Sequence, residues 1–376
     1  MSVFPDNFEN SRAENSGDSR FAPRPEIFCA GRPHGGDFSA PLATLSRRGF
    51  LRLAVAAPLA LCAAFSEGAT SFKGVDYTPL SKLAKLFGMK CQTLEFKKKQ
   101  RVYGKSVSLN FEIHRRDMYI NGRKIWLGAP VIESKSMLYI PTLDIEKTLT
   151  PILYPQKIKN PPALKRIVID PGHGGKDKGA TNKNLYEKFL TLDISARLAK
   201  ILRAKGYQVA LTRNRDVFLE LPTRPAFANA NGADLFVSVH INSAVSSAPS
   251  GVETFALSPA GLPSTSSAAF RPSDARKLTG NDSDPWNVLA AYYVQKSLKD
   301  GTNALDRGVK RARFAVLQTS KAPAILVECG FISNPSESAK LATPNYRESI
   351  AQSIAAGLSN YGAMLSRVRQ EQQAQK

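Results

Sequence analysis

The second half of the chain alternates short apolar segments with longer segments of helical periodicity, and this order is the strongest constraint on its fold. Residues 166–170 (RIVID) form a continuous apolar run, as expected of a strand buried on both faces of a parallel sheet. Residues 189–206 carry one apolar helical stripe, formed by Leu190, Ile194, Leu198 and Ile201. Later segments predict strands at 207–212, 234–240, 251–257, 314–317 and 324–329, and helices at 222–232, 286–298 and 345–365. Such alternation predicts a mostly parallel α/β sheet flanked by helices.

The segment before this sheet has a different pattern, which predicts a small α+β domain. A helix is expected after Pro79, where Leu80, Leu83 and Leu86 share one face. Short alternating runs predict strands, and Asn121 with Gly122 predicts the tight turn of a hairpin. The predicted divisions are therefore a small domain at 72–155, a Pro-rich linker at 156–165, a sheet domain at 166–365 and a disordered tail at 366–376.

Residues 1–69 predict a disordered leader followed by an export signal. Residues 1–45 are rich in Pro, Gly, Ser and charge and have no apolar periodicity. An arginine pair at 47–48 precedes the apolar run 51–65, which is shorter than the roughly 18 residues of a membrane span. The order SRRGFL resembles a twin-arginine export signal, which implies delivery to the periplasm or cell envelope without a permanent membrane anchor. The alternative is a short buried helix beside a chance arginine pair.

The composition favours some partners and excludes some kinds of site. Lys and Arg outnumber Asp and Glu by 52 to 31, and the net charge of +21 favours anionic polymers as partners. Nucleic acid, an anionic membrane surface and acidic cell-wall material all satisfy this condition. The four cysteines include no CxxC pair, so neither a disulfide framework nor a thiolate zinc site is indicated.

Four side chains of the predicted sheet domain stand where a reactive site would form. His173, His240 and Glu328 each lie at the carboxyl end of a predicted strand, and Glu187 lies at the head of a helix. Ligands of such sheets bind beyond the carboxyl ends of the strands. Two imidazoles and the Glu187 carboxylate can bind a divalent metal and leave one position open, with Glu328 free to act as a base. Taken singly, a strand-end histidine is more often a hydrogen-bonded structural residue, and a loop glutamate is more often solvated.

The motifs around these four residues, taken together, are specific to one family. The segments DPGHGGKDKGA, LTRNRDVFLELPTRPAFANANGADLFVSVHINS, GVETF, RGVKRARFAVL and PAILVECGFISNP occur in the order found in one known family. Over about residues 165–365 the chain resembles the zinc-dependent N-acetylmuramoyl-L-alanine amidases of the "amidase 3" type. Thr191 departs from that pattern, because the family usually has Asn there.

The resemblance implies a fold, a reaction and a role for each of the four residues. The implied fold is a zinc-peptidase-like, mostly parallel α/β sheet. The implied reaction is hydrolysis of peptidoglycan at the amide bond between N-acetylmuramic acid and the L-alanine of the stem peptide. One zinc ion per chain is expected on His173, Glu187 and His240, with Glu328 as the catalytic carboxylate.

Further expectations concern substrate, regulation and the small domain. Asn242, Arg307 and Arg313 are candidate substrate-binding residues, although strand-flanking charge is often simply solvated. The small domain resembles the copper-amine-oxidase N-terminal-like domain that precedes the catalytic part of some amidases, and we expect it to associate with the cell wall. The polar stretch 258–285 is expected to be an inserted loop, where some cell-division amidases carry an inhibitory helix that an activator protein displaces.

Three other functions are alternatives to this one. A carboxypeptidase-like zinc peptidase would use the same chemistry, but the sequence shows no clear arginine pocket for a free carboxylate. A non-catalytic cell-wall-binding protein fits the charge and the small domain, but it has no reason to place a base and three ligands at strand ends. A nucleic-acid binder is suggested only by charge, without a recognised reader motif, and the predicted export argues against it.

Overall fold

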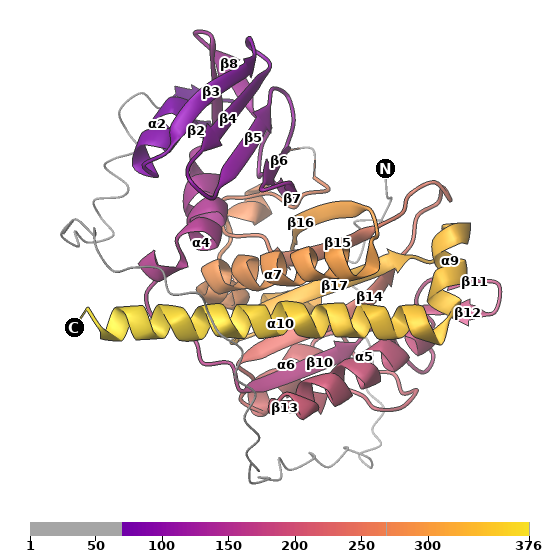
Figure 1. Cartoon of the computed structure of the whole chain (residues 1–376). Helices are drawn as coiled ribbons and strands as arrows, with labels where there is room; N and C mark the ends of the chain where they lie inside the picture. The colour runs from indigo at the N-terminus through magenta and orange to yellow at the C-terminus, as the bar shows by residue number, and fades with distance from the viewer. Residues whose placement is uncertain (1–69, 268, 376) are drawn as a thin grey trace. The chain divides into compact units, whose positions relative to one another are not determined.

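The computed structural model describes residues 70–267 and 269–375 (Figure 1). The leader and export signal predicted for residues 1–69 lie outside the described residues. Within the described ranges no helix is long and apolar enough to cross a membrane.

Six strands form the sheet of the second half of the chain. In spatial order they are β13 (Gln208–Leu211), β10 (Arg166–Pro171), β14 (Leu235–Asn242), β17 (Ala324–Phe331), β15 (Val252–Leu257) and β16 (Asp306–Ala312). All neighbours are parallel except β15 and β17, which are antiparallel. The prediction of a mostly parallel sheet is confirmed, and its central strands are almost wholly buried.

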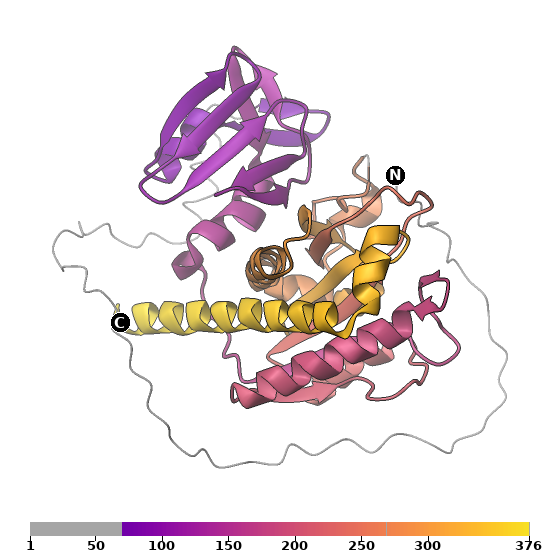
Figure 2. The ribbon, with the colours of Figure 1, turned by 45° about the vertical axis from the view of Figure 1, so that its right-hand side comes forward.

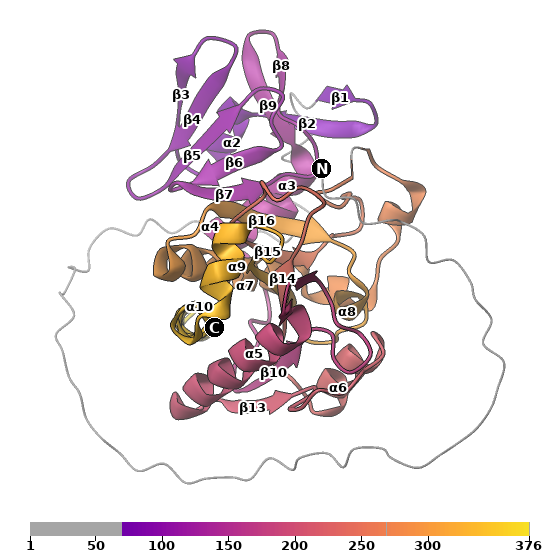
Figure 3. The same ribbon diagram turned by 90° about the vertical axis from the view of Figure 1, so that its right-hand side faces the viewer.

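Helices cover both faces of this sheet. They are α5 (Glu187–Ala204), α6 (Thr223–Ala230), α7 (Asp284–Thr302), α8 (Ala315–Gln318), α9 (Pro335–Ala342) and α10 (Pro344–Gln373). Helices α5, α7 and α10 lie on one face, and α6 with α8 lies on the other (Figures 2 and 3). The stripe predicted for α5 is buried at Leu190, Ile194 and Leu198, and Leu202 rather than Ile201 completes it. This apolar contact fixes the start of α5, and therefore Glu187, beside the sheet.

The first part of the described chain is the predicted α+β unit. Its strands are β1 (Thr70–Phe72), β2 (Val75–Pro79), β3 (Lys90–Glu95), β4 (Lys99–Tyr103), β5 (Ser108–Glu112), β6 (Asp117–Ile120), β7 (Arg123–Trp126), β8 (Ile132–Ser134) and β9 (Met137–Pro141). Its helical segments are α2 (Leu80–Leu86), α3 (Thr142–Asp144), η1 (Ile145–Leu149), α4 (Thr150–Leu153) and η2 (Pro155–Lys157). Asn121 and Gly122 form the predicted hairpin turn, both with positive φ. Residues 158–165, before β10, are neither helix nor strand.

The α+β unit and the second half of the chain share one sheet, which the sequence did not predict. Strand β7 pairs in parallel with β16, with Ile125 opposite Val309. Strands β3–β7 thereby extend the six-stranded sheet to eleven strands among the described residues. The Trp126 indole Nε1 donates to the Arg307 carbonyl over 2.8 Å, and the Lys124 amide donates to Asp306 Oδ2 over 3.2 Å. The edge of β16 is therefore covered by the small domain.

Two predictions about secondary structure are wrong. Residues 314–317 (FAVL) were expected to be a strand but lie in the short helix α8, while the strand in this region is β16. The apolar run identifies burial but not its geometry, because four residues suit a buried strand or one helical turn. The tail 366–376 was expected to be disordered, but α10 continues to Gln373, with Val368 buried.

Candidate metal centre

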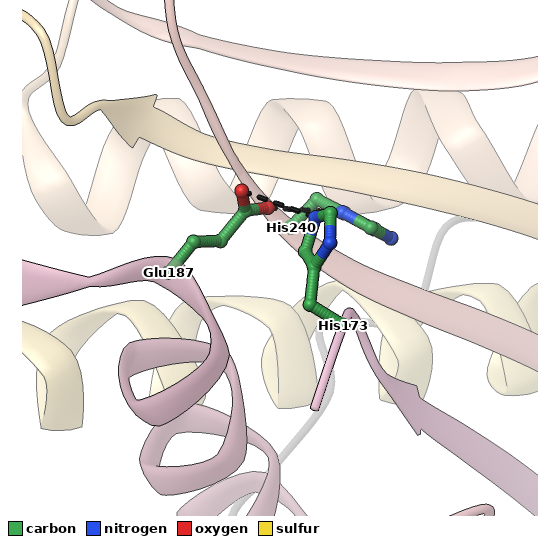
Figure 4. A group of neighbouring side chains, drawn as sticks. All are labelled: His173, Glu187 and His240. Atoms are coloured by element: carbon green, nitrogen blue, oxygen red, sulfur yellow. Dashed lines mark hydrogen bonds and ion pairs between the residues drawn. The ribbon is translucent and has the colours of Figure 1, made fainter. Parts of the chain in front are cut away.

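Three of the predicted side chains converge. His173 follows β10, Glu187 is the first residue of α5, and His240 lies near the end of β14 (Figure 4). One ligand atom from each lies within 4.8 Å of the other two. The rings of His173 and His240 meet edge to face, with centroids 5.0 Å apart. Distant segments of the chain thus assemble a set of two imidazoles and one carboxylate.

The orientation of the His173 ring is set by its backbone conformation and by a neighbouring carboxylate. Its φ is 62°, a left-handed conformation that is uncommon outside glycine and often found at functional sites. Its Nδ1 lies 2.8 Å from Asp177 Oδ2, and its Nε2 lies 3.1 Å from Glu187 Oε2. A carboxylate on one ring nitrogen fixes the ring and leaves the other nitrogen for a metal. Asp177 was not among the predicted residues, although its position four residues after His173 was a usable signal.

Glu187 sits at the centre of the group and is held by two backbone amides. The hairpin of β11 (Thr181–Asn182) and β12 (Leu185–Tyr186) leads directly into it. The Ala180 amide donates to Oε2 over 2.8 Å, and the Ile241 amide donates to Oε1 over 3.0 Å. His240 Nδ1 also lies 3.0 Å from Oε1. The side chain is 5% exposed, so its orientation is fixed before any ligand arrives.

Two glycines make room for these side chains. A Cβ atom at Gly172 would lie 2.4 Å from Cε1 of His240. A Cβ atom at Gly179, where φ is +65°, would lie 2.6 Å from Glu187 Oε2 and 2.7 Å from His173 Cδ2. All three distances are far inside van der Waals contact, so the loops around the centre require glycine at these positions.

Two buried arginines hold the loop that carries His173. Arg213 donates to the carbonyls of Pro171 and Gly172, and Arg224 donates to the carbonyls of Pro171 and His173. Burial and the charge of Arg224 lower the pKa of Arg213 to about 10. Both side chains are almost fully buried, which the sequence did not reveal because arginines of this kind look like surface charge.

Thr191, the residue that departs from the family pattern, takes part in the same network. It is fully buried, and its hydroxyl donates to the Gly172 carbonyl over 2.8 Å and accepts from Arg213 Nη2 over 3.2 Å. Threonine therefore supplies a hydrogen-bond donor to the loop, as an asparagine amide also would.

Glu328 lies in β17 directly opposite His240 in β14. Its Oε2 atom is buried and has no hydrogen-bond partner within the described part of the chain. Burial and the negative charges of Glu187 and Glu253 raise the pKa of Glu328 well above its ordinary value, while Lys310 lowers it. A carboxylate with a free oxygen and a raised pKa, next to the three converging side chains, suits proton transfer.

The predicted substrate-binding residues already have hydrogen-bond partners: Asn242 ends β14, Arg307 lies in β16 and Arg313 follows β16. The Asn242 amide donates to Glu253 Oε1 over 2.8 Å, and Arg307 Nε donates to Glu253 Oε2 over 2.7 Å. Arg313 donates instead to carbonyls of the 258–285 segment, including that of Asp274 over 2.6 Å. Glu253, which accepts hydrogen bonds from Asn242 and Arg307, was not predicted. The sequence does not show which glutamate of a strand is buried.

The donor set fits zinc. Imidazole nitrogens with one carboxylate suit Zn²⁺, whereas Mg²⁺ and Ca²⁺ prefer shells made of oxygen alone. The unpartnered Oε2 of Glu328 beside this set is consistent with a group kept free for a reacting molecule.

Comparisons with known proteins identify the family of the second half of the chain. A family model described as N-acetylmuramoyl-L-alanine amidase matches residues 167–360, which is more than half of the chain. The chain belongs to the N-acetylmuramoyl-L-alanine amidase family. The matched amidase domain contains all four residues of the predicted site.

Named relatives of this amidase domain come from several bacteria. The chain is 37% identical over 226 residues to N-acetylmuramoyl-L-alanine amidase AmiC of Escherichia coli O6:H1, covering 54% of each protein. It is 33% identical over 227 residues to AmiA of Escherichia coli K12, covering 54% of this chain and 78% of AmiA. The chain thus spans about half the length of AmiC. A solved catalytic domain, that of the amidase CwlV from Bacillus (Paenibacillus) polymyxa, has 33% identity and a TM-score of 0.44, covering 53% of this chain and 98% of CwlV.

The ionisable groups of the amidase domain predict opposite pH responses with and without metal. Burial lowers the pKa of His173, but the hydrogen bonds and charges of Glu187 and Asp177 outweigh it, so this pKa lies above its ordinary value of 6.5. Burial raises the pKa of Glu187, but His173 and His240 outweigh it and lower this pKa below 4.5. The His173 contribution is complete below pH 6.5 and is lost as the pH rises through its folded pKa. The Glu187 contribution is present above pH 4.5 and is lost as the pH falls through its folded pKa.

We therefore expect the Tm of chelator-treated protein to fall as the pH rises above 6.5 and through the raised pKa of His173. Added zinc should reverse that trend, because metal binding requires neutral histidine and becomes stronger as protons leave. Differential scanning fluorimetry with and without zinc measures both slopes. The exposed His114→Asn variant is the control. Equal slopes of Tm against pH in the zinc-free and zinc-loaded proteins would show that His173 and Glu187 do not govern the pH dependence of stability.

Proposed function

We propose that the protein is a zinc-dependent N-acetylmuramoyl-L-alanine amidase that hydrolyses peptidoglycan between N-acetylmuramic acid and the L-alanine of the stem peptide. The observation that carries this proposal is the convergence of His173, Glu187 and His240 beside the free oxygen of Glu328. Membership of the amidase family supports the choice of substrate.

Each residue has a definite task in this mechanism. A zinc ion, when bound by His173, Glu187 and His240, supplies a Lewis acid that polarises a carbonyl and lowers the pKa of water from about 15.7 to about 7. Asp177 holds His173 so that its Nε2 points toward the site. Glu328 accepts the proton of the attacking water and delivers it to the leaving alanine nitrogen. Its raised pKa suits this double role, because the same group must take up and give back a proton.

We propose Asn242, Arg307 and Arg313 as contacts for the glycan or the stem-peptide carboxylates. Arg307 retains 29% exposure of its side chain and lies one strand away from Glu253. Arg313 would first have to leave the carbonyls of the 258–285 segment, so its contribution is expected to depend on that segment. An activator protein of the cell-division machinery that moves this segment is the partner we propose.

The proposed place of action is the periplasm or cell envelope, reached by the twin-arginine route. This proposal is supported by the SRRGFL order in the sequence and by the substrate of the family. The small domain at 72–155 is proposed to associate with the cell wall, with cell division as the process served.

The experiment that tests the function combines zinc analysis with product analysis. Purified protein should contain one zinc ion per chain, and digestion of peptidoglycan sacculi should release intact stem peptides that begin with L-alanine. Mass spectrometry of the muropeptides identifies that product. Release of single terminal amino acids would indicate a carboxypeptidase instead, and intact sacculi with tightly bound protein would indicate a cell-wall-binding protein.

A further inference from the structure

Two glutamates of the amidase domain face each other across neighbouring strands. Glu253 in β15 and Glu328 in β17 are directly paired in an antiparallel ladder. Side chains at such positions share one face of the sheet with Cβ atoms roughly 5 Å apart, and like charges there repel. Glu253 is 2% exposed, and Oε2 of Glu328 is buried, so water does little to screen the pair. Nearby cations must therefore neutralise the negative charge of one or both carboxylates. The cations beside the pair are Lys310 and Arg307.

Of the two glutamates, only Glu253 accepts hydrogen bonds from these cations within the described residues. Its Oε2 accepts from Lys310 Nζ over 2.5 Å and from Arg307 Nε over 2.7 Å. Its Oε1 accepts from Asn242 Nδ2 over 2.8 Å. Within the described residues Oε2 of Glu328 receives no hydrogen bond, although the charge of Lys310 is close enough to lower the pKa of Glu328.

Both cations lie against aromatic rings. The Lys310 side chain is 13% exposed, and its Nζ lies 5.5 Å from the Trp126 ring centroid and 5.6 Å from that of Phe255. The Arg307 guanidinium lies 4.6 Å from the Phe331 ring centroid, and its own carbonyl accepts from Trp126. Burial lowers the pKa of Lys310, which means that its charged form needs a counter-ion. The two carboxylates whose charges act on Lys310 are those of Glu253 and Glu328.

We propose that Glu253 is a positioning residue that keeps Lys310 and Arg307 away from Glu328, so that the reacting carboxylate retains a free oxygen. This inference rests on the proposed function, in which Glu328 receives the proton of water. A lysine that paired with Glu328 would occupy that oxygen and reduce its ability to accept a proton. The fold thus uses one buried glutamate to neutralise the cations and leaves the other available for chemistry.

The test compares four full-length, zinc-loaded proteins: wild type, Glu253→Gln, Lys310→Met and Glu253→Gln with Lys310→Met. Glutamine preserves the shape of Glu253 and removes its charge, which leaves Lys310 to pair with Glu328. We expect kcat for stem-peptide release to fall about 30-fold or more, with zinc content unchanged. Adding Lys310→Met, which keeps the length of the side chain without its charge, should restore at least about tenfold of that loss. Recovery is expected to be incomplete because Arg307 remains.

The exposed Glu371→Gln in α10 is the matched control for the loss of one carboxylate far from the site, and it should behave as wild type. Wild-type kcat in Glu253→Gln, or a double variant that is unfolded or no more active than the single one, would overturn the inference. So would a Glu253→Gln protein that folds only when Lys310→Met is added, since Lys310 would then have failed to pair with Glu328. Wild-type protein that releases no stem peptides would overturn the proposed function, and the inference with it.

Discussion

Replacing Glu328 by glutamine is expected to abolish hydrolysis while zinc remains bound. Glutamine has the size of glutamate but cannot accept a proton, so kcat/KM should fall by about 10²–10⁴-fold, the usual worth of a positioned general base. Zinc content should stay at one per chain, because the three converging side chains do not include Glu328. Inductively coupled plasma analysis of zinc and muropeptide release by liquid chromatography measure the two quantities on the same sample.

The same variant should make the metal-free protein more stable. The pKa of Glu328 is raised by burial and by neighbouring negative charge, so its ionised form costs folding free energy once the pH exceeds its ordinary value of 4.5. A neutral glutamine removes that cost, and the Tm of the chelator-treated protein at pH 7.5 is expected to rise. Loss of zinc from Glu328→Gln would show that base and ligand have been confused. Retention of wild-type kcat would mean that another group accepts the proton.

Much of the fold follows from local pattern. Continuous apolar runs such as 166–170 and 234–240 predict buried parallel strands because such strands are covered on both faces. The short run 314–317 has the same composition but forms one turn of helix, since a run of this length does not distinguish the two geometries. Strand β16 was missed for the opposite reason: its Arg307, Lys310 and Arg311 look exposed, yet they find buried partners in the tertiary structure.

The four central residues were singled out by their places at predicted strand ends and at the head of a helix, together with the family resemblance of the motifs around them. Their supporting residues were not predictable in the same way. Arg213 and Arg224 hold backbone carbonyls of the His173 loop, and no periodicity marks an arginine that is buried for this purpose. The pairing of β7 with β16 could not be predicted either, because strand pairing between distant segments depends on tertiary packing and not on local sequence.

Removing the central ligand is expected to have the other large effect. Glu187 contacts both histidines, at 3.1 Å from His173 Nε2 and 3.0 Å from His240 Nδ1, and two backbone amides hold it in place. Glu187→Gln replaces a charged ligand by a neutral amide in a buried position. We expect no stoichiometric zinc, no stem-peptide release and no rise in Tm when zinc is added, because a ligand that does not bind cannot stabilise the fold. Zinc competition with a chromophoric chelator and scanning fluorimetry provide the measurements.

A graded series separates loss of a ligand from loss of its support. Asp177→Asn leaves the three ligands in place but weakens the hold on His173 Nδ1, so zinc affinity should fall about 10- to 100-fold and activity should return in excess zinc. Glu187→Gln should not recover under the same conditions, and Glu371→Gln should match wild type throughout. If Glu187→Gln binds zinc with wild-type affinity, the metal is held elsewhere, and the convergence of His173, Glu187 and His240 then reflects only the ion pairs of a metal-free fold.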